Sequence, residues 1–122
     1  MRRLRLSRPA EADIATILSW SQAQFGKVAA ERYAALIAAA LRDVALDPAR
    51  VGAEERPELG AGLMSYHLFF SRKSAARGAV RMPRHLVLCR LEPDGAVAVG
   101  RVLHDAMELS RHLPGTDEGD RT

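Results

Sequence analysis

The most informative run of residues lies in the last quarter of the chain and reads Val99-Gly100-Arg101-Val102-Leu103-His104-Asp105-Ala106-Met107-Glu108-Leu109-Ser110-Arg111-His112-Leu113-Pro114. The first part is short and apolar, which predicts a strand. The second part predicts a helix of one or two turns that Pro114 closes. The residues upstream predict the rest of a sheet and the helices that cover it.

Three more strands precede this one in the sequence. Residues 85–91 predict a strand that pairs with residues 97–103 through a hairpin turn, because Asp94-Gly95 is typical of tight hairpins. Residues 64–70 predict a further strand, and residues 3–6 a short one with Leu4 and Leu6 facing inward. Residues 47–62 are rich in proline and glycine and predict a loop, whereas residues 71–83 predict a long basic connection.

Two amphipathic helices lie between the first strand and that loop. Ser7 is a suitable N-cap and Pro9 falls in the first turn of a helix over residues 8–25. Its predicted apolar stripe consists of Ala10, Ile14, Ile17, Leu18, Ser21 and Phe25. Gly26 ends it, and residues 28–46 form the second helix, with Ala29, Tyr33, Leu36, Ile37, Ala40, Leu41 and Val44 on its inner face. The short connection requires an antiparallel helix hairpin.

The predicted order is therefore β-α-α-β-β-β, followed by a short C-terminal helix. This is an α+β fold in which the helix hairpin covers one face of an antiparallel sheet. A length of 122 residues indicates one domain, 1–122, of which residues 115–122 form a polar tail.

Alternation along the last hairpin predicts which residues share a face of the sheet. One face would carry Leu86, Leu88, Arg90, Val97, Val99, Arg101 and Leu103. The other would carry Val87, Cys89, Leu91, Ala98, Gly100 and Val102. The second set is small and apolar, which favours packing against the helices. The first set combines large aliphatic residues with two arginines, so we expect an uncovered binding surface for an acidic partner.

Composition limits the class of protein without identifying it. The net charge of +3 and pI of about 9.6 favour an acidic partner, but nucleic acid, an acidic protein and simple solubility all remain open. Cys89 is the single cysteine, so no internal disulfide forms, which fits a reducing cytoplasm. We find no apolar run long enough to span a membrane and no secretory signal.

Several local features occur together in an order that is fairly specific. They are Phe25-Gly26, then Ala29, Ala30 and Tyr33, then Pro48, then Arg56-Pro57-Glu58-Leu59 before Tyr66, and finally Arg101-Val102-Leu103-His104. Over residues 3–113 this order resembles the ParE branch of the RelE/ParE toxin superfamily. The resemblance implies a toxin of a type II toxin–antitoxin system, with a role in plasmid stabilisation.

Members of the ParE branch typically inhibit DNA gyrase and are neutralised by a small ParD-like antitoxin whose C-terminal segment wraps the toxin. The resemblance thus implies a hetero-oligomer, no cofactor, no catalytic residue and no sequence-specific DNA binding by the chain alone. We expect the antitoxin on Leu86, Leu88, Arg90, Val99, Arg101 and Leu103. We expect the target on Arg72, Lys73, Arg77, Arg81, His104 and Arg111.

The alternative is a RelE-like mRNA endonuclease acting on the ribosome, with His104, Arg101 and Arg90 as its catalytic residues. The basic connection at residues 71–83 is longer than this superfamily leads us to expect, and no tyrosine or lysine follows residue 73. The incomplete set of nuclease residues favours the ParE branch. A third interpretation is a degenerate toxin that binds only its antitoxin or an operator complex.

Each candidate residue also has a simpler interpretation. His104 is either a general acid or base near neutral pH or a residue that closes the strand through backbone hydrogen bonds. Arg90 and Arg101 either grip phosphate or carboxylate or remain solvated. Trp20 either packs at the edge of the helix hairpin or anchors an interface. The four histidines and Cys89 lack the spacing of a known metal site, so we predict no metal.

Overall fold

The computed structural model describes residues 1–75 and 80–106. Its elements are β1 (Leu4–Leu6), α1 (Arg8–Phe25), α2 (Lys27–Leu46), β2 (Ala53–Glu55), β3 (Leu63–His67), the 3-10 helix η1 (Leu68–Ser71), β4 (His85–Leu91) and β5 (Val97–His104). Arg77, Arg111, the predicted C-terminal helix beyond Ala106 and the predicted tail lie outside the described residues.

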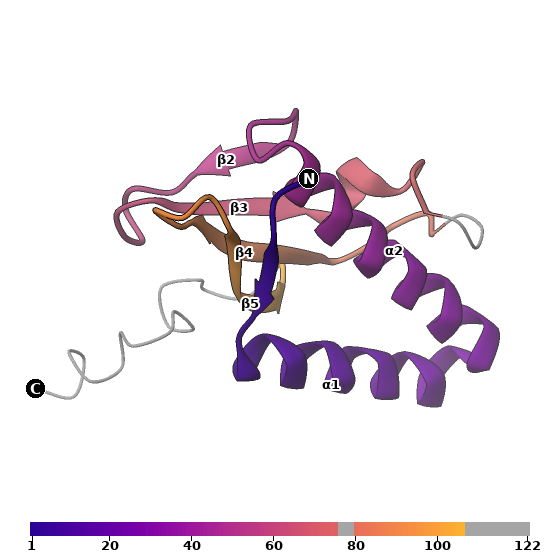
Figure 1. Cartoon of the computed structure of the whole chain (residues 1–122). Coiled ribbons are helices and arrows are strands. Elements are labelled where there is room, and N and C mark those ends of the chain that lie inside the picture. Colours follow the sequence, from indigo (N-terminus) through magenta and orange to yellow (C-terminus); the bar gives the residue numbers. More distant parts are fainter. Residues whose placement is uncertain (76–79, 107–122) are drawn as a thin grey trace, which may run out of the picture.

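The five strands form one mixed sheet in the order β1-β5-β4-β3-β2 (Figure 1). β1 runs parallel to β5, and the other neighbours are antiparallel. The two helices form a hairpin that packs on one face of this sheet. The predicted α+β order is confirmed, with β2 as an additional strand inside the predicted loop. Its sequence Ala53-Glu54-Glu55 has low strand propensity, and it is held by pairing with β3.

The local signals at the start of the chain act as predicted. The Ser7 Oγ accepts a hydrogen bond from the Ala10 N–H at 3.0 Å and so caps α1. Gly26 separates the two helices with a φ of 93°, a conformation that side chains rarely adopt, so α2 can start at once. Leu4 and Leu6 of β1 pack against the core, as predicted.

The third strand is shorter than predicted. Residues 64–70 were expected to be extended, but β3 ends at His67 and the chain turns into η1. The His67 Nδ1 accepts the Phe69 N–H at 3.0 Å, which caps the turn. The Ser71 Oγ is bound to both the Tyr66 hydroxyl and the Asp43 carboxylate at 2.7 Å, so the chain is drawn back toward α2. Short-range polar contacts thus override an apolar strand-like sequence.

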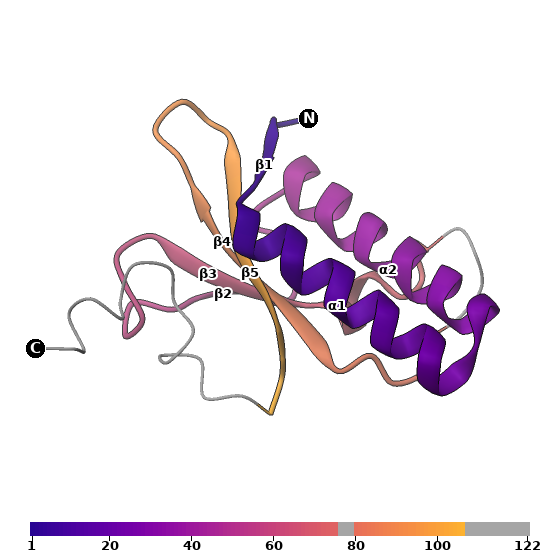
Figure 2. The same cartoon turned by 90° about the horizontal axis from the view of Figure 1, so that it is seen from below.

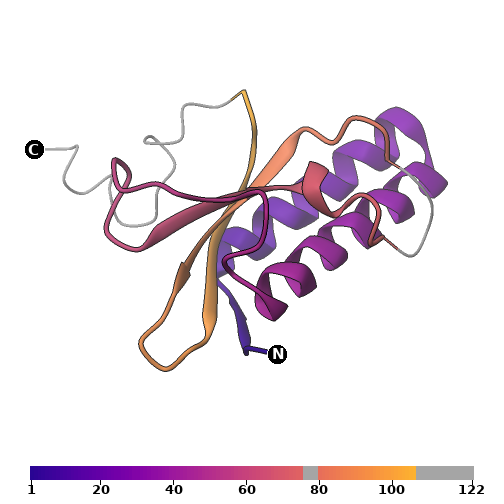
Figure 3. The ribbon, with the colours of Figure 1, turned by 90° about the horizontal axis from the view of Figure 1, so that it is seen from above.

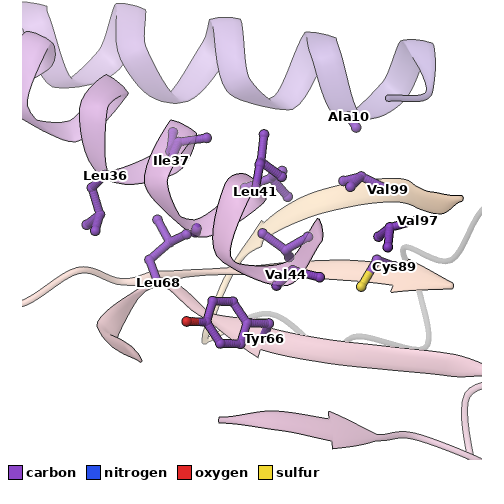
Figure 4. Packing of buried hydrophobic residues seen from close by; sticks show 13 residues of the cluster. Ala10, Leu36, Ile37, Leu41, Val44, Tyr66, Leu68, Cys89, Val97 and Val99 are labelled. Carbon is purple, nitrogen blue, oxygen red and sulfur yellow. The ribbon is translucent and has the colours of Figure 1, made fainter. Parts of the chain in front are cut away.

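The main core lies between α2 and the sheet (Figure 4). Leu36, Ile37 and Val44 of α2 are at most 3% exposed. Each of these side chains contributes roughly 1.5–3 kcal/mol through burial. Tyr66 of β3 is buried beneath the same helix, with its hydroxyl bound to Ser71. Phe25, which was predicted to belong to this core, is 68% exposed, and that prediction is wrong.

A β-bulge in β5 corrects the predicted faces of the sheet. Cys89 pairs with Val99 but Leu88 pairs with Arg101, so Gly100 is an extra residue without a partner on β4. The alternation therefore shifts by one position, and Val97 and Val99 lie on the helix-covered face together with Val102. Leu91, predicted to be in the core, is 43% exposed. One inserted residue is enough to reverse the inward and outward positions.

The opposite face of the sheet was expected to be uncovered, but the structure shows that it is covered. Leu86, Leu88 and Leu103 form a second cluster there, and Leu59 and Leu63 pack over it. All three sheet residues are at most 7% exposed. Leu59, from the segment between β2 and β3, and Leu63, the first residue of β3, therefore cover the aliphatic part of the face that alternation had left for a partner.

Candidate partner-binding groove

A groove of about 800 Å³ lies between the helix hairpin and the end of the β4–β5 hairpin. Figures 2 and 3 show the helices reaching past the sheet, where the segment leading into β4 runs beside them. Four parts of the chain line the groove. They are α1 (Asp13, Thr16, Ile17, Trp20, Ser21, Phe25), α2 (Ala29, Arg32, Tyr33), the segment before β4 (Val80, Met82, Arg84), and the strands β4 and β5 (His85, Arg101, Val102, Leu103, His104). Residues far apart in the sequence thus form one surface.

Large apolar side chains remain exposed in this groove. Trp20 is 57% and Phe25 is 68% exposed, and their rings meet edge to face with centroids 5.6 Å apart. Met82, from the segment before β4, also lines the groove and is 76% exposed. Aromatic and methionine side chains in such a position are typical of a protein interface. Of the two interpretations of Trp20, these observations favour the interface anchor.

An ion pair fixes α1 to β5 along one wall of the groove. The Asp13 carboxylate accepts hydrogen bonds from Arg101 Nε at 2.7 Å and from a terminal nitrogen of the same guanidinium at 2.9 Å. It also accepts the backbone N–H of Val102 at 2.9 Å. Hydrogen bonding to Asp13 raises the pKa of Arg101. Arg101 therefore holds the fold together, and the prediction of a free arginine on an uncovered face is wrong.

A second polar cluster joins the ends of three strands. The Asp105 carboxylate follows β5 and accepts hydrogen bonds from Arg84 at 2.9 Å and from His67 Nε2 at 2.9 Å. Hydrogen bonding to Arg84 is the main cause that lowers the pKa of Asp105 to about 2. His67 uses both ring nitrogens, because its Nδ1 accepts the Phe69 N–H. The cluster positions the segment before β4 against the end of β5.

Two further histidines meet at the adjoining end of the groove. His85 and His104 are opposite each other across β4 and β5, and their rings meet edge to face at 5.3 Å. The Tyr33 hydroxyl lies 2.7 Å from His85 Nδ1 and accepts the Arg84 N–H at 3.1 Å. Burial, followed by the nearby charge of His104, lowers the pKa of His85 to about 4. His85 is therefore neutral at physiological pH.

The structure does not bring the three proposed nuclease residues together. Arg90 pairs with Ala98 near the hairpin turn, and its Nε donates to the Ala61 carbonyl at 3.3 Å. His104 lies at the other end of the hairpin, opposite His85. His104 Nδ1 accepts the Ala106 N–H at 3.1 Å, which agrees with the simpler interpretation as a strand-closing residue.

The predicted antitoxin and target residues separate in the fold. Arg101 and Leu103 line the groove, whereas Arg90, Leu88 and Val99 lie around a smaller hollow beside β1. Among the predicted target residues, Arg72 stacks on the Phe69 ring at 3.8 Å, and Lys73 and Arg81 are exposed. Arg81 directly precedes Met82 of the groove.

Sequence reasoning missed Tyr33 and Asp105, two polar residues of these clusters, as functional candidates. Counting pairs outward from the Asp94-Gly95 turn would place His85 opposite Leu103, and only the bulge moves it opposite His104. Gly100 in an otherwise regular strand was the signal for that bulge.

Two further observations concern metals and membranes. Across residues 1–75 and 80–106, no group of three or more histidine, cysteine, aspartate or glutamate side chains is placed to hold a metal ion. Neither α1 nor α2 combines the length and apolar character that a membrane crossing requires.

Comparison with known proteins identifies the family of the chain. A sequence model of the family described as ParE toxin of type II toxin-antitoxin system, parDE, matches residues 4–109. No match to the chain is found among curated proteins. The match spans every described helix and strand and nearly the whole chain. The chain therefore belongs to the ParE toxin family and is the toxin type of a toxin–antitoxin pair.

Proposed function

We propose that this chain is a stoichiometric toxin that binds and poisons DNA gyrase, and that its ParD-like antitoxin neutralises it by laying an amphipathic helix in the groove. The observation that supports the antitoxin site is the groove itself, in which exposed apolar residues line a cavity of about 800 Å³. An amphipathic helix seated in an apolar groove is a recurring form of peptide recognition. Gyrase as the target rests on membership of the ParE family.

The charges around the groove favour an acidic partner. Three arginines, Arg32, Arg84 and Arg101, line it, and Asp13 is the one acidic residue among the described lining residues. Arg32 is exposed at the start of α2. A helix with an apolar stripe and flanking carboxylates would complement this arrangement, because the apolar side chains fill the groove while the carboxylates meet the arginines. This surface replaces the sheet face predicted from alternation, which Leu59 and Leu63 cover.

The same geometry favours binding over catalysis. Two of the guanidinium groups near His104 are paired with carboxylates, Arg101 with Asp13 and Arg84 with Asp105. His67 has both ring nitrogens in hydrogen bonds. A nuclease site needs a cation to stabilise the developing charge and an available acid and base. We therefore propose that the basic residues Arg72, Lys73 and Arg81, of which Lys73 and Arg81 are exposed, contact the target rather than cleave RNA.

Expression in bacteria with and without the antitoxin tests this proposal. We expect the chain alone to arrest growth and co-expressed antitoxin to restore it. Thr16→Trp fills the groove from its exposed wall, so this variant should still arrest growth but escape the antitoxin. Ala15→Trp is the matched control, because Ala15 is exposed on the same helix and does not line the groove. Equal rescue of both variants would rule out the groove as the antitoxin site.

A further inference from the structure

We propose that His85 and His104 form a carboxylate-binding element at the end of the groove, which an acidic side chain of the antitoxin's docking helix occupies with uptake of a proton. This inference rests on the proposed function, since it names what the groove recognises in the partner. The pair lines the groove and is created by the β5 bulge, which places the two rings opposite each other.

The hydrogen bonds around each ring decide which nitrogen carries the proton. The Tyr33 hydroxyl accepts the Arg84 N–H, so its own proton is directed to His85 Nδ1. His104 Nδ1 accepts the Ala106 N–H. In the neutral form both rings therefore carry their proton on Nε2. No described residue accepts a hydrogen bond from either Nε2, which leaves two N–H donors for an acceptor from outside the chain.

Most of the charged and titratable groups around this pair are already bound within the fold, whereas Arg32 of α2, which also lines the groove, is exposed. Asp105, after β5, is held by Arg84 from the segment before β4 and by His67 from β3. Its nearer oxygen lies 3.6 Å from His104 Nδ1, and that nitrogen is bound to the Ala106 N–H. On the α1 side, Asp13 is bound to Arg101, and on the α2 side Tyr33 is bound to His85. A carboxylate from a partner would thus be the first acceptor for the two Nε2–H groups.

The two histidines would contribute differently. His85 stays neutral throughout the physiological range because its pKa is about 4, so it acts as a neutral donor. The His104 side chain is 39% exposed. A carboxylate on its Nε2–H would stabilise its imidazolium form, in which the added proton occupies Nδ1, displaces the Ala106 N–H and has the Asp105 oxygen 3.6 Å away as its acceptor. Binding then takes up a proton, and by linkage the affinity rises as the pH falls.

Octanoate and octylammonium are probes that test this directly on the full chain. Each carries the same apolar tail, and Trp20, the single tryptophan, lines the groove and reports occupancy by its fluorescence. Histidine ring protons followed by NMR identify the binding end. We expect octanoate to bind with a millimolar Kd, to shift the His85 and His104 signals, and to bind at least about threefold more tightly at pH 6.0 than at pH 7.5. We expect octylammonium to bind more weakly at both pH values.

Variants separate the histidine pair from general charge effects. His104→Gln should keep the Trp20 response to octanoate but lose its pH dependence. Arg90→Gln removes a cation that lies outside the groove and should leave the pH dependence intact. Equal binding of octanoate and octylammonium would overturn the carboxylate element while leaving the apolar groove in place. A micromolar or tighter Kd for octanoate would overturn the peptide partner in favour of a fatty-acid ligand, and no Trp20 response to either probe would overturn both the element and the groove.

Discussion

The two ends of the β4–β5 hairpin carry similar charged residues but use them in different ways. At the turn, Asp94 pairs with Arg3 and Arg5 on the open surface. Both ends join residues that are distant in the sequence, but at the other end Asp13 and Asp105 are largely shielded from solvent. The first arrangement consists of exposed ion pairs at a turn, whereas the second shapes the wall of the groove. The difference shows that the surroundings of an ion pair, more than its residue types, decide whether it positions a functional surface.

Asp13→Ala should have the largest effect on stability. The substitution leaves the Arg101 guanidinium and the Val102 N–H without their acceptor in a partly buried site. We expect the free energy of unfolding to fall by about 2–3 kcal/mol, measured by urea denaturation. Asp13→Asn, which keeps one acceptor oxygen, should lose less. A loss below about 0.5 kcal/mol for Asp13→Ala would show that the groove end of the β4–β5 hairpin depends no more on its ion pairs than the turn does.

His85 should make the fold sensitive to mild acid. Its folded pKa of about 4 lies below the ordinary value of 6.5, so the unfolded chain binds a proton first as the pH falls. Stability should therefore be fully present above pH 6.5 and decline between pH 6.5 and about 4, by roughly 2 kcal/mol. Urea midpoints across this range measure it. His85→Asn should flatten the decline, and an unchanged slope in that variant would assign the effect to other groups.

Asp105→Asn should lower the stability by a smaller amount, and this loss should shrink as the pH falls. Because the pKa of Asp105 is lowered to about 2, its contribution is present above the ordinary pKa of 3.8 and is lost as the pH falls toward 2. We expect a loss of about 1 kcal/mol at pH 7, because an amide replaces a charged acceptor of Arg84 and His67. Thermal unfolding at pH 7 and at pH 3 would compare the two. A variant as stable as the parent at pH 7 would contradict a positioning role for Asp105.

Asp94→Asn should have the smallest effect and completes the comparison. The carboxylate is exposed, and its pairs with Arg3 and Arg5 compete with water and salt. Its hydrogen bond from the Ala96 N–H at 3.0 Å can be kept by the asparagine oxygen. We expect the Tm to change by less than about 1 °C at physiological salt. A change as large as that of Asp13→Ala would remove the distinction between the two ends.

The sequence predicted the elements better than the surface. Helix boundaries follow from Ser7, Gly26 and apolar periodicity, which are local signals, and the structure confirms them. The faces of β5 depend on a single unpaired residue, Gly100, whose effect appears only once the register with β4 is known. Likewise, the cover that Leu59 and Leu63 provide is a contact between distant segments. The groove could not be read from any one stretch, because its walls come from both helices and both hairpin strands.

The family itself was recognisable from the order of local features, and the match over residues 4–109 confirms it. The predicted antitoxin and target residues were chosen by charge and alternation. Those properties do not show that Arg101 is bound to Asp13 or that Val99 is buried. Internal ion pairs and burial therefore decide which predicted residues stay available to a partner.

The most direct test of the proposed function is a titration of the purified chain into an ATP-dependent gyrase supercoiling assay, with cleaved DNA scored on the same gel. Our account predicts inhibition and trapped double-strand breaks at nearly one toxin per gyrase subunit, and recovery of supercoiling when antitoxin is added. An unaffected gyrase reaction, together with cleavage of ribosome-bound mRNA at amounts far below one toxin per ribosome, would contradict it.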